Sequence, residues 1–381
     1  MEQNLYQAYV RLLEQELVPA MGCTEPIAVA YAAAAAAAGI IAGEPDRQLL
    51  VISRVTEEQQ AQIAAYLQNA AFTIRESDSG ALFEITITLC GGGHRAVCRI
   101  AEDHTNIVCI ERDGETVYSR TPETSTVTAA SDKSLLTVEQ IVEFADALEI
   151  RDVKHIFDRQ IACNMAIAEE GLQRDYGARI GQILLKTQKD DVITRAKAYA
   201  AAASDARMGG CEKPVVINSG SGNQGITASV PVVVYAGELG ASEDLLYRAL
   251  AVSNLVTLHL KSGIGPLSAY CGVISAGCGA AAGITYLYGG KFREIAHTVV
   301  NALAINSGII CDGAKASCAA KIASAVEAGI LGMQMFREGS QFYDGDGIVT
   351  KGVENTIRNI SRLATDGMRK TDAEIIKMML S

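Results

Sequence analysis

The distribution of strand-like segments constrains the fold of this chain more than any other feature of its sequence. Between residues 48 and 118, runs rich in β-branched and aromatic residues follow one another, and one helical segment at 57–70 separates the first two. The runs are LLVISRV, FTIRE, FEITITLC, RAVCRIA, NIVCIE and ETVYS. Gly91-Gly92-Gly93 and Asp113-Gly114 are the expected turns. We therefore expect one β–α–β–β–β-like module of about 75 residues.

The rest of the chain has the periodicity of helices, so the predicted fold class is α+β, with a large, mainly helical domain. We expect that domain to comprise residues 1–45 and 135–381, with the α+β module inserted at 46–120 and a polar linker at 121–134. The expected helices are 3–17, 27–41, 138–148, 152–170, 191–207, 244–260, 266–287, 292–305, 314–329 and 350–365.

Composition and charge exclude several classes of function. The net charge is −11 and there is no Trp, so neither a basic face nor a base-stacking surface for nucleic acid is expected. The N-terminus lacks the basic and apolar regions of a signal peptide, and the alanine run at 31–38 is too short to span a membrane. With free cysteines and no export signal, we expect a cytoplasmic protein that binds neither membrane nor nucleic acid.

Cysteines near the C-terminus are the strongest candidates for chemistry. Cys271, Cys311 and Cys318 lie in Gly/Ala-rich, nearly uncharged stretches. Soft thiolate ligands, close approach of the backbone and a water-poor pocket suit an iron–sulfur cluster. Three thiolates on a four-iron cluster leave one iron open, and an open iron is a Lewis acid.

The alternative is that these cysteines only fill the core, because free cysteine behaves as a small hydrophobic residue. We favour packing for five others: Cys90, Cys98, Cys109, Cys163 and Cys211. No pair has the short spacing of a zinc ribbon.

Cys271 and Cys278 form the first of two C-x6-C pairs. Gly265-Pro266 is typical of a helix start, with Pro266 at the first helical position, so both cysteines are expected in one helix. Seven residues of helix span about 10.5 Å, too far for both sulfurs to reach one small cluster. Only one of the two is therefore expected to be a ligand.

Cys311 and Cys318 form the second pair, and Asp312 between them is a good N-cap residue. Cys311 is then expected in the loop before a helix, with Cys318 two turns inside it. The loop would fold Cys311 back toward the helix, and three ligands are a more natural number than four.

Cys23 is the next candidate, in the sequence MGCTEPIAVA before an alanine-rich helix. Thr24 can cap this helix and Pro26 fits near its first position. A thiolate at a helix start has a lowered pKa and can act as a nucleophile or a base. The alternative is a buried cysteine at a tight turn.

A polar glycine loop at 218–225, NSGSGNQG, is the third candidate. Its backbone N–H groups can form an anion-binding nest. The spacing G-x-G-x-x-G also matches the dinucleotide fingerprint, but Pro231 follows early, and the acids Glu238 and Glu243 come 13 and 18 residues after Gly225 with no clear strand between. We favour a small carboxylate over a nucleotide, with an ordinary glycine turn as the alternative. Candidate substrate-binding residues here are Ser219, Ser221, Gly222, Asn223 and Gln224.

Lys261 lies ten residues before Cys271. It is either a partner for a substrate carboxylate or a solvated lysine, and its context slightly favours the solvated one.

Four motifs, MGCTEPIA, NSGSGNQGI, KSGIGPLSAYCG and GIICDGAKASCAAK, together resemble the L-cysteine desulfidase family of the UPF0597 type, which is related to the iron–sulfur L-serine dehydratase α-chains. The resemblance covers nearly the whole chain. It implies a [4Fe-4S] cluster held by Cys271, Cys311 and Cys318, with one open iron, and it makes Cys23 the proton acceptor. Cys278 matches no ligand of the family.

The implied reaction is α,β-elimination, in which L-cysteine and water give pyruvate, ammonia and hydrogen sulfide without pyridoxal phosphate. The 218–225 loop would hold the carboxylate and the amine of this small amino acid, with Thr24 and Glu25 nearby. L-serine dehydration at the same site is the nearest alternative, followed by a non-enzymatic cluster sensor and a nucleotide-dependent oxidoreductase. A homodimer is left open.

Overall fold

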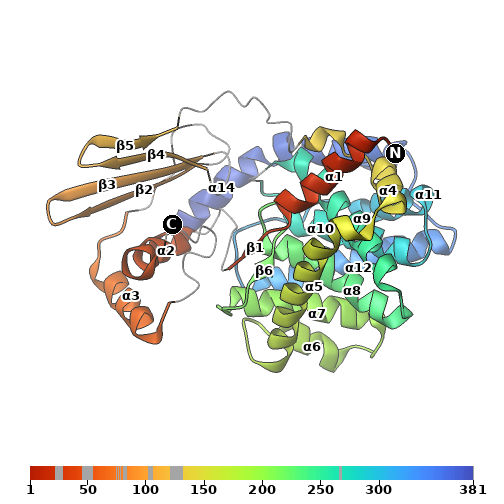
Figure 1. Cartoon of the computed structure of the whole chain (residues 1–381), viewed down its shortest axis with the longest axis horizontal. Helices are drawn as coiled ribbons and strands as arrows, with labels where there is room; N and C mark the ends of the chain where they lie inside the picture. The colour runs from red at the N-terminus through yellow and green to blue at the C-terminus, as the bar shows by residue number, and fades with distance from the viewer. Residues whose placement is uncertain are drawn as a thin grey trace.

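The computed structural model describes residues 1–21, 29–44, 55–73, 75, 77, 79, 84–101, 106–120, 132–265 and 268–380. Within these ranges the chain forms a helical body, a four-stranded antiparallel sheet and a two-stranded antiparallel pair (Figure 1). The expected α+β class with a mainly helical domain is confirmed. In this part of the chain no helix has the length and apolar character needed to cross a membrane.

One buried helix, α10 (Gly272–Leu287), lies at the centre of the body. Its neighbours are α8 (Gly222–Leu239), α9 (Glu243–Ile264), α11 (Phe292–Ile305) and α12 (Ser317–Arg337). Glycines let these helices approach closely: a Cβ atom on Gly277 would lie 2.6 Å from the carbonyl oxygen of Ala325. The run GCGAAAG in α10 is therefore a packing surface for several helices at once.

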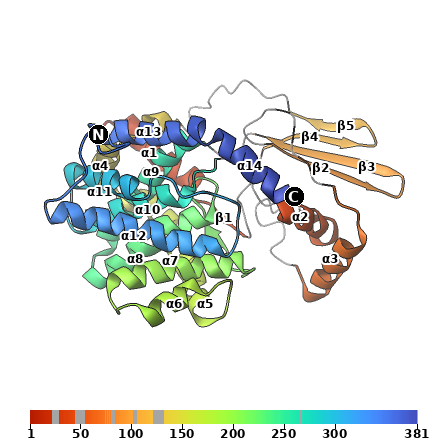
Figure 2. The ribbon, with the colours of Figure 1, turned by 180° about the vertical axis from the view of Figure 1, so that it is seen from behind.

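Further helices surround this centre (Figure 2). They are α1 (Gln3–Glu16), α4 (Val138–Ala147), α5 (Ile150–Gln173), α6 (Ile180–Thr187), α7 (Val192–Met208) and α13 (Val353–Arg362), with a 3₁₀ turn at Lys133–Leu135. After a π-helical turn at Leu363–Gly367, the last helix, α14 (Arg369–Leu380), runs outward from the body toward α2. The aromatic rings of Tyr6 and Tyr9 pack on Phe144, which fastens the N-terminal helix to the body.

Two short strands link the N-terminal region to the middle of the chain. β1 (Pro19–Ala20) pairs antiparallel with β6 (Val215–Val216), and Ile217 N donates to Val18 O at 2.9 Å. The chain around Ala20 therefore lies beside the segment that leads into the polar glycine loop.

The sheet is an antiparallel meander in the order β2 (Glu84–Gly91), β3 (His94–Ala101), β4 (Ile107–Arg112), β5 (Glu115–Ser119). Its turns are at Gly92-Gly93 and Asp113-Gly114, as expected, and all four residues have positive φ. Of the first two expected strands, LLVISRV lies outside the described residues except for Val55, and the described residues of FTIRE, which are Phe72, Thr73 and Arg75, are not in a strand.

The helix α3 (Glu57–Asn69) begins at Thr56, whose hydroxyl accepts from Gln59 N. α2 (Val29–Ala42) packs against α3, and Figure 1 shows both helices on the side of the molecule that carries the sheet. From the sequence, the segment of α2 was expected in the helical body instead. The domain boundaries themselves stay a prediction.

Three helices, α6, α8 and α14, were not among those expected. In α8 the misleading residue was Pro231, which stands inside the helix. Ser221 caps α8 by accepting from Gln224 N, and most of the helix is buried. Tertiary packing therefore outweighs the cost of a proline in the helix interior.

Candidate functional site

Backbone hydrogen bonds hold the segment at 269–271 beside that at 309–311. Cys271 N donates to Ile309 O at 3.0 Å, and Cys311 N donates to Ala269 O at 2.6 Å. These bonds form an isolated antiparallel bridge between Tyr270 and Ile310. Two cysteines 40 residues apart in the sequence are thereby brought side by side.

The thiols of Cys271 and Cys311 are within hydrogen-bonding reach of each other, and Cys318 is close enough to interact electrostatically with Cys271. The Cys311 thiol, together with burial, raises the pKa of Cys271 well above its ordinary value. Cys318 is partly buried and its thiol donates to Gly313 O at 3.7 Å. The structure therefore gathers the three predicted ligands in one place.

Three soft sulfur donors in a largely buried setting have the chemistry that an iron–sulfur cluster requires. Within the described ranges, however, no three His, Cys, Asp or Glu side chains stand in metal-binding geometry. The donor set thus fits the group by type and neighbourhood, while the sulfur positions are not preformed. Their role as ligands stays a prediction.

Cys278 lies apart, in the interior of α10, where burial raises its pKa to about 12. The expected helix start at Pro266 is wrong, because α10 begins at Gly272 and Cys271 is its N-cap residue. Residues 266 and 267 themselves lie outside the described part. Cys271 and Cys278 are therefore not both inside one helix.

The predicted helix start at Asp312 is also wrong. α12 begins at Ser317, so Cys318 lies in its first turn rather than two turns inside. The carboxylate of Asp312 accepts from the ammonium groups of Lys315 and Lys321 and is therefore not available as a cap. Cys311 does precede the helix, as expected.

Lys321 brings positive charge close to the thiols. Burial opposes the charged form of Lys321, but Asp312 and the nearby cysteines outweigh it and raise its pKa. Lys321 Nζ also donates to Ile310 O at 2.6 Å. Positive charge at this position favours the thiolate form that metal ligands need.

Lys261 is not the solvated lysine that its sequence context favoured. It is partly buried near the end of α9, where its Nζ donates to Gly265 O at 2.6 Å. Burial lowers its pKa to about 8, although the charges of Cys311 and Cys271 act in the opposite direction. Lys261 therefore lies within electrostatic range of the thiols.

Asp372 of α14 also reaches this region, although its sequence context did not predict it. Burial raises its pKa, and the backbone N–H of Ala269 and the charge of Lys261 oppose that shift. Its Oδ1 is buried and has no partner within the described residues. Because α14 was not expected, no signal in the sequence placed this carboxylate near Cys271.

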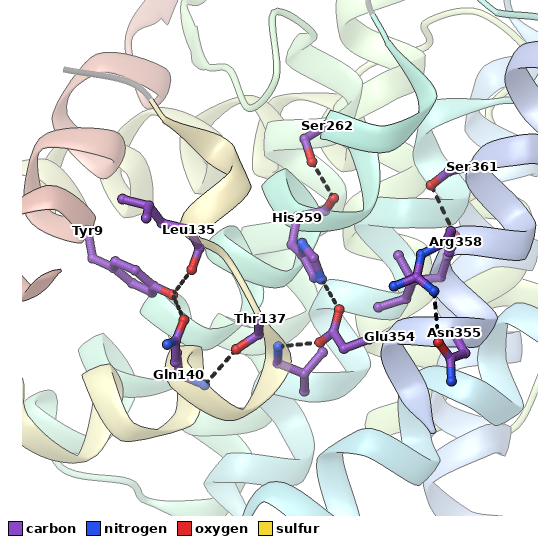
Figure 3. A network of polar contacts seen from close by, with 12 residues as sticks. Tyr9, Leu135, Thr137, Gln140, His259, Ser262, Glu354, Asn355, Arg358 and Ser361 are labelled. Carbon is purple, nitrogen blue, oxygen red and sulfur yellow. Dashed lines mark hydrogen bonds and ion pairs between the residues drawn. The ribbon is translucent and has the colours of Figure 1, made fainter. Parts of the chain in front are cut away.

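A polar network holds α9 in place beside α4 and α13 (Figure 3). One oxygen of Glu354 pairs with His259 Nε2 at 2.7 Å, and the other accepts from Val138 N at 2.8 Å. Ser262 donates to His259 O one residue beyond Lys261. The network therefore fixes the turn of α9 from which Lys261 extends.

The 218–225 loop is a tight turn followed directly by a helix. Asn218 and Ser221 exchange backbone hydrogen bonds at 3.0 and 3.1 Å, with positive φ at Ser219 and Gly220. Ser221 then caps α8 by accepting from Gln224 N, and the start of a helix favours an anion. The glycine turn and the anion-binding helix start are therefore both present.

The glycine spacing of this loop has a packing cause. A Cβ on Gly222 would lie 2.4 Å from Nε of Arg207, and one on Gly225 would lie 2.0 Å from Val216 O. The strand before the loop, β6, pairs antiparallel with β1, so the parallel βαβ unit of a dinucleotide site is not found among the described residues.

The first turn of α8 lies against the first turn of α10. A Cβ on Gly272 would be 2.6 to 2.9 Å from the amide atoms of Gln224. Gln224 is 5% exposed and its Oε1 has no partner in the described structure. The predicted substrate loop and the predicted ligand Cys271 are thus neighbours. The remaining predicted residues, Cys23, Thr24 and Glu25, lie outside the described part of the chain.

Comparison with known proteins identifies relatives over the full length. The model of the family described as "Serine dehydratase alpha chain" matches residues 46–377. A UPF0597 protein of Desulfitobacterium hafniense is 51% identical, covering 100% of this chain and 98% of its own. A UPF0597 protein of Lachnoclostridium phytofermentans is 41% identical, covering 99% of this chain and 100% of its own. One of Treponema denticola is 40% identical, covering 100% of this chain and 99% of its own.

Proposed function

Because this chain belongs to the serine dehydratase alpha chain family, we propose that it is an iron–sulfur-dependent lyase that converts L-cysteine and water to pyruvate, ammonia and hydrogen sulfide. Membership of the family implies an amino-acid dehydratase or deaminase type of lyase. The observation that carries the finer proposal is the meeting of three thiols beside the first turn of α8.

Cys271, Cys311 and Cys318 would hold the cluster. When bound, such a cluster supplies a Lewis-acidic iron that withdraws electrons from the leaving group or the carboxylate of the substrate. Lys321 and Lys261 offset the negative charge that three thiolates bring to a partly buried place. This charge balance supports the assignment of the three ligands.

The other chemical roles fall to residues of this chain near the same place. The backbone N–H groups at the start of α8 would bind the substrate carboxylate, because a helix N-terminus favours an anion. Cys23, which lies outside the described residues, would accept the proton from Cα as a thiolate. A tightly packed site with Gln224 against Gly272 would limit the entry of water.

L-serine dehydration is the second candidate, and the description of the matching family favours it. The two reactions share the carboxylate, the amine and the Cα proton, and they differ only in the leaving atom. A sulfur leaving group needs less protonation than a hydroxyl, because a thiol is far more acidic than an alcohol. The leaving group must therefore be identified by assay.

The test is a reconstitution and activity assay without oxygen. The protein is loaded with iron and sulfide, and pyruvate and sulfide release are measured from L-cysteine and from L-serine. We expect Cys23→Ala to keep the brown colour and lose activity, and Cys311→Ala to lose both. Cys278→Ala is the matched control, since this cysteine is buried apart from the other thiols, and it should keep colour and activity.

Two outcomes would overturn the proposal. A wild-type protein that binds no iron would remove the cluster, and an iron-loaded protein that forms pyruvate from neither amino acid would remove the reaction. Pyruvate from L-serine alone would replace desulfidation by dehydration.

A further inference from the structure

Three buried amide side chains form a hydrogen-bonded chain that ends at the polar glycine loop. Gln160 Nε2 of α5 donates to Asn254 Oδ1 of α9 at 3.0 Å, and Asn254 Nδ2 donates back to Gln160 Oε1 at 2.9 Å. Asn218, the first residue of the loop, donates from Nδ2 to Asn254 Oδ1 at 3.0 Å and to Asn254 O at 3.2 Å. All three side chains are 0% exposed, so two helices of the body hold the start of the loop.

The other end of the Asn218 amide holds the next residue of the loop. Ser219 Oγ donates to Asn218 Oδ1 at 2.8 Å, and the backbones of Asn218 and Ser221 exchange hydrogen bonds across the turn. The nitrogen and the oxygen of this buried amide are therefore both used within the protein. A buried amide that is paired at both ends fixes the backbone around it.

Ser219 has a backbone conformation that serine rarely adopts. Its φ is 51°, in the left-handed region, and Gly220 follows with a φ of 76°. A residue other than glycine is strained in this region and keeps such a conformation only where its surroundings hold it. Asn218 supplies that hold through the Ser219 hydroxyl, and Asn254 fixes Asn218. The conformation of Ser219 therefore depends on the chain of amides.

A second amide of α5 anchors the segments on either side of the loop. Asn164 Oδ1 accepts from Val216 N at 2.8 Å, and its Nδ2 donates to Ser229 Oγ of α8 at 2.9 Å. Gln160 and Asn164 are four residues apart and therefore on the same face of α5. The strand before the loop and the helix after it are thus anchored separately, and Asn218 anchors the turn between them.

The turn at Ser219 and Gly220 is the part of the loop that a ligand can reach. Both residues are partly exposed, whereas Asn218 before them and Ser221 after them are buried. The turn leads directly into α8, whose first turn lies against Gly272 beside the predicted ligand Cys271. The conformation of this turn therefore decides which groups a substrate beside the thiols can contact.

We propose that Asn218 and Asn254 are positioning residues for the elimination. Asn254, backed by Gln160, fixes Asn218, and Asn218 fixes the left-handed turn at Ser219 against which the substrate binds. This inference rests on the proposed function and adds two residues that act through the turn. The turn contacts the substrate before and during the reaction, so loosening it weakens binding more than it slows the chemical step.

The first test is the kinetics of two variants with each amino acid. Asn218→Ala removes the support of the turn while Asn254 Oδ1 stays paired with Gln160 Nε2, so this variant is expected to fold. Asn254→Ala removes the same support from the side of the body. We expect each change to raise KM about tenfold and to keep kcat within about twofold of the wild type. The double variant should raise KM no more than the larger single change, because both residues act through one chain.

Asn301→Ala is the matched control for these variants. Asn301 of α11 is also 0% exposed, its Nδ2 donates to Gly332 O at 3.0 Å, and its Oδ1 accepts from Phe342 N at 3.0 Å. Its loss should lower the melting temperature as Asn254→Ala does, because both changes remove a buried, paired amide. It should leave KM unchanged.

Hydrogen exchange gives a readout that does not depend on catalysis. Ser221 N donates to Asn218 O at 3.0 Å, which protects this N–H while the turn is held. In mass spectrometry of the iron-loaded and of the metal-free protein, the peptide that contains Ser221 should exchange faster in Asn218→Ala and in Asn254→Ala. It should exchange at the wild-type rate in Asn301→Ala.

The inference is overturned if KM stays at the wild-type value in both variants, if the single effects multiply in the double variant, or if exchange at Ser221 is unchanged. Should Asn254→Ala not fold, Asn218→Ala decides by the same KM and exchange criteria. A wild type that forms pyruvate from neither amino acid refutes the proposed reaction and this role with it. Pyruvate formation with an unchanged KM in the variants refutes the positioning alone.

Discussion

The amide of Gln224 lies directly against the backbone of Gly272. A Cβ atom added to Gly272 would stand 2.6 Å from Cδ, 2.7 Å from Nε2 and 2.9 Å from Oε1 of this side chain. Because Gly272 follows Cys271 in the sequence, this contact joins the polar loop to the thiol site. It also makes the position of the amide sensitive to a single methyl group.

Gly272→Ala is therefore expected to displace the Gln224 amide while the helix remains folded. Alanine favours a helix over glycine by about 0.5–1 kcal/mol, which offsets part of the crowding. We expect KM for the amino acid to rise about tenfold with a melting temperature close to that of the wild type. Kinetics and thermal unfolding measure the two effects.

The matched control for this change is Gly237→Ala in α8, where an added Cβ meets nothing within 4 Å. It should stabilise the protein by about 0.5 kcal/mol and leave KM unchanged. An unchanged KM in Gly272→Ala would show that the contact with Gln224 does not position the ligand.

Gly277, which lies in α10 as Gly272 does, should affect stability alone. In Gly277→Ala the new Cβ would lie 2.6 Å from the carbonyl oxygen of Ala325, and backbone atoms of α12 cannot move aside as a flexible side chain can. We expect a loss of about 1–3 kcal/mol in the free energy of unfolding, measured by urea denaturation. A variant as stable as the wild type would contradict the close packing of α10 on α12.

Asp205 should make the stability of the protein fall as the pH rises. Burial raises its pKa to about 6, against the opposing backbone N–H of Gly181, whose nitrogen is 3.1 Å from Oδ2. The folded state favours the protonated form, so Asp205 makes its full contribution to the free energy of unfolding below about pH 4. That contribution is lost between about pH 4 and pH 6, at a cost of about 3 kcal/mol at most.

Asp205→Asn removes the titration and retains an acceptor for Gly181 N. The variant should therefore be more stable than the wild type above pH 6, with a flatter dependence on pH in urea denaturation. Asp191→Asn is the opposite case, because the N–H of Thr194 lowers the pKa of Asp191, so its contribution is present at neutral pH and lost on acidification. The same slope in wild type and Asp205→Asn would refute the assignment.

The sequence was a good guide where local signals and packing agree. The turns at Gly92-Gly93 and Asp113-Gly114 follow from residues that tolerate positive φ, and most helices of the body follow from their periodicity. It failed for α8 because Pro231 was read as a break, while the cap at Ser221 and burial keep the helix intact. Local rules do not contain the energy of tertiary contacts.

The candidate site, too, could be predicted only in part, because some of its contacts are local and others are long-range. The gathering of Cys271, Cys311 and Cys318 could be expected from their setting, but the bridge between Tyr270 and Ile310 that aligns two of them is a long-range pairing. Asp312 has the residue type of a helix cap, yet two lysines occupy its carboxylate. Asp372 arrives from a helix about 100 residues away, which no local pattern predicts.

The carboxylate of Asp372 provides the last prediction, because the backbone N–H of Ala269 lies close enough to it to lower its pKa. Ala269 is two residues before Cys271, and its carbonyl accepts from Cys311 N. We therefore expect the Asp372 carboxylate to support the segment that aligns two of the predicted ligands. We expect Asp372→Ala to retain less than about half of the iron held by the wild type after desalting, because a loosened ligand binds less tightly.

Asp372→Asn removes the charge and keeps a side-chain oxygen that faces the backbone N–H of Ala269, so it should retain iron as the wild type does. Asp366→Ala, at an exposed residue of the π-helical turn before α14, is the matched control and should also retain it. Alkylation of Cys271 in the metal-free protein gives a second readout, which should be faster in Asp372→Ala alone. Equal iron content and equal alkylation in all three variants would show that the C-terminal helix does not support the thiol site.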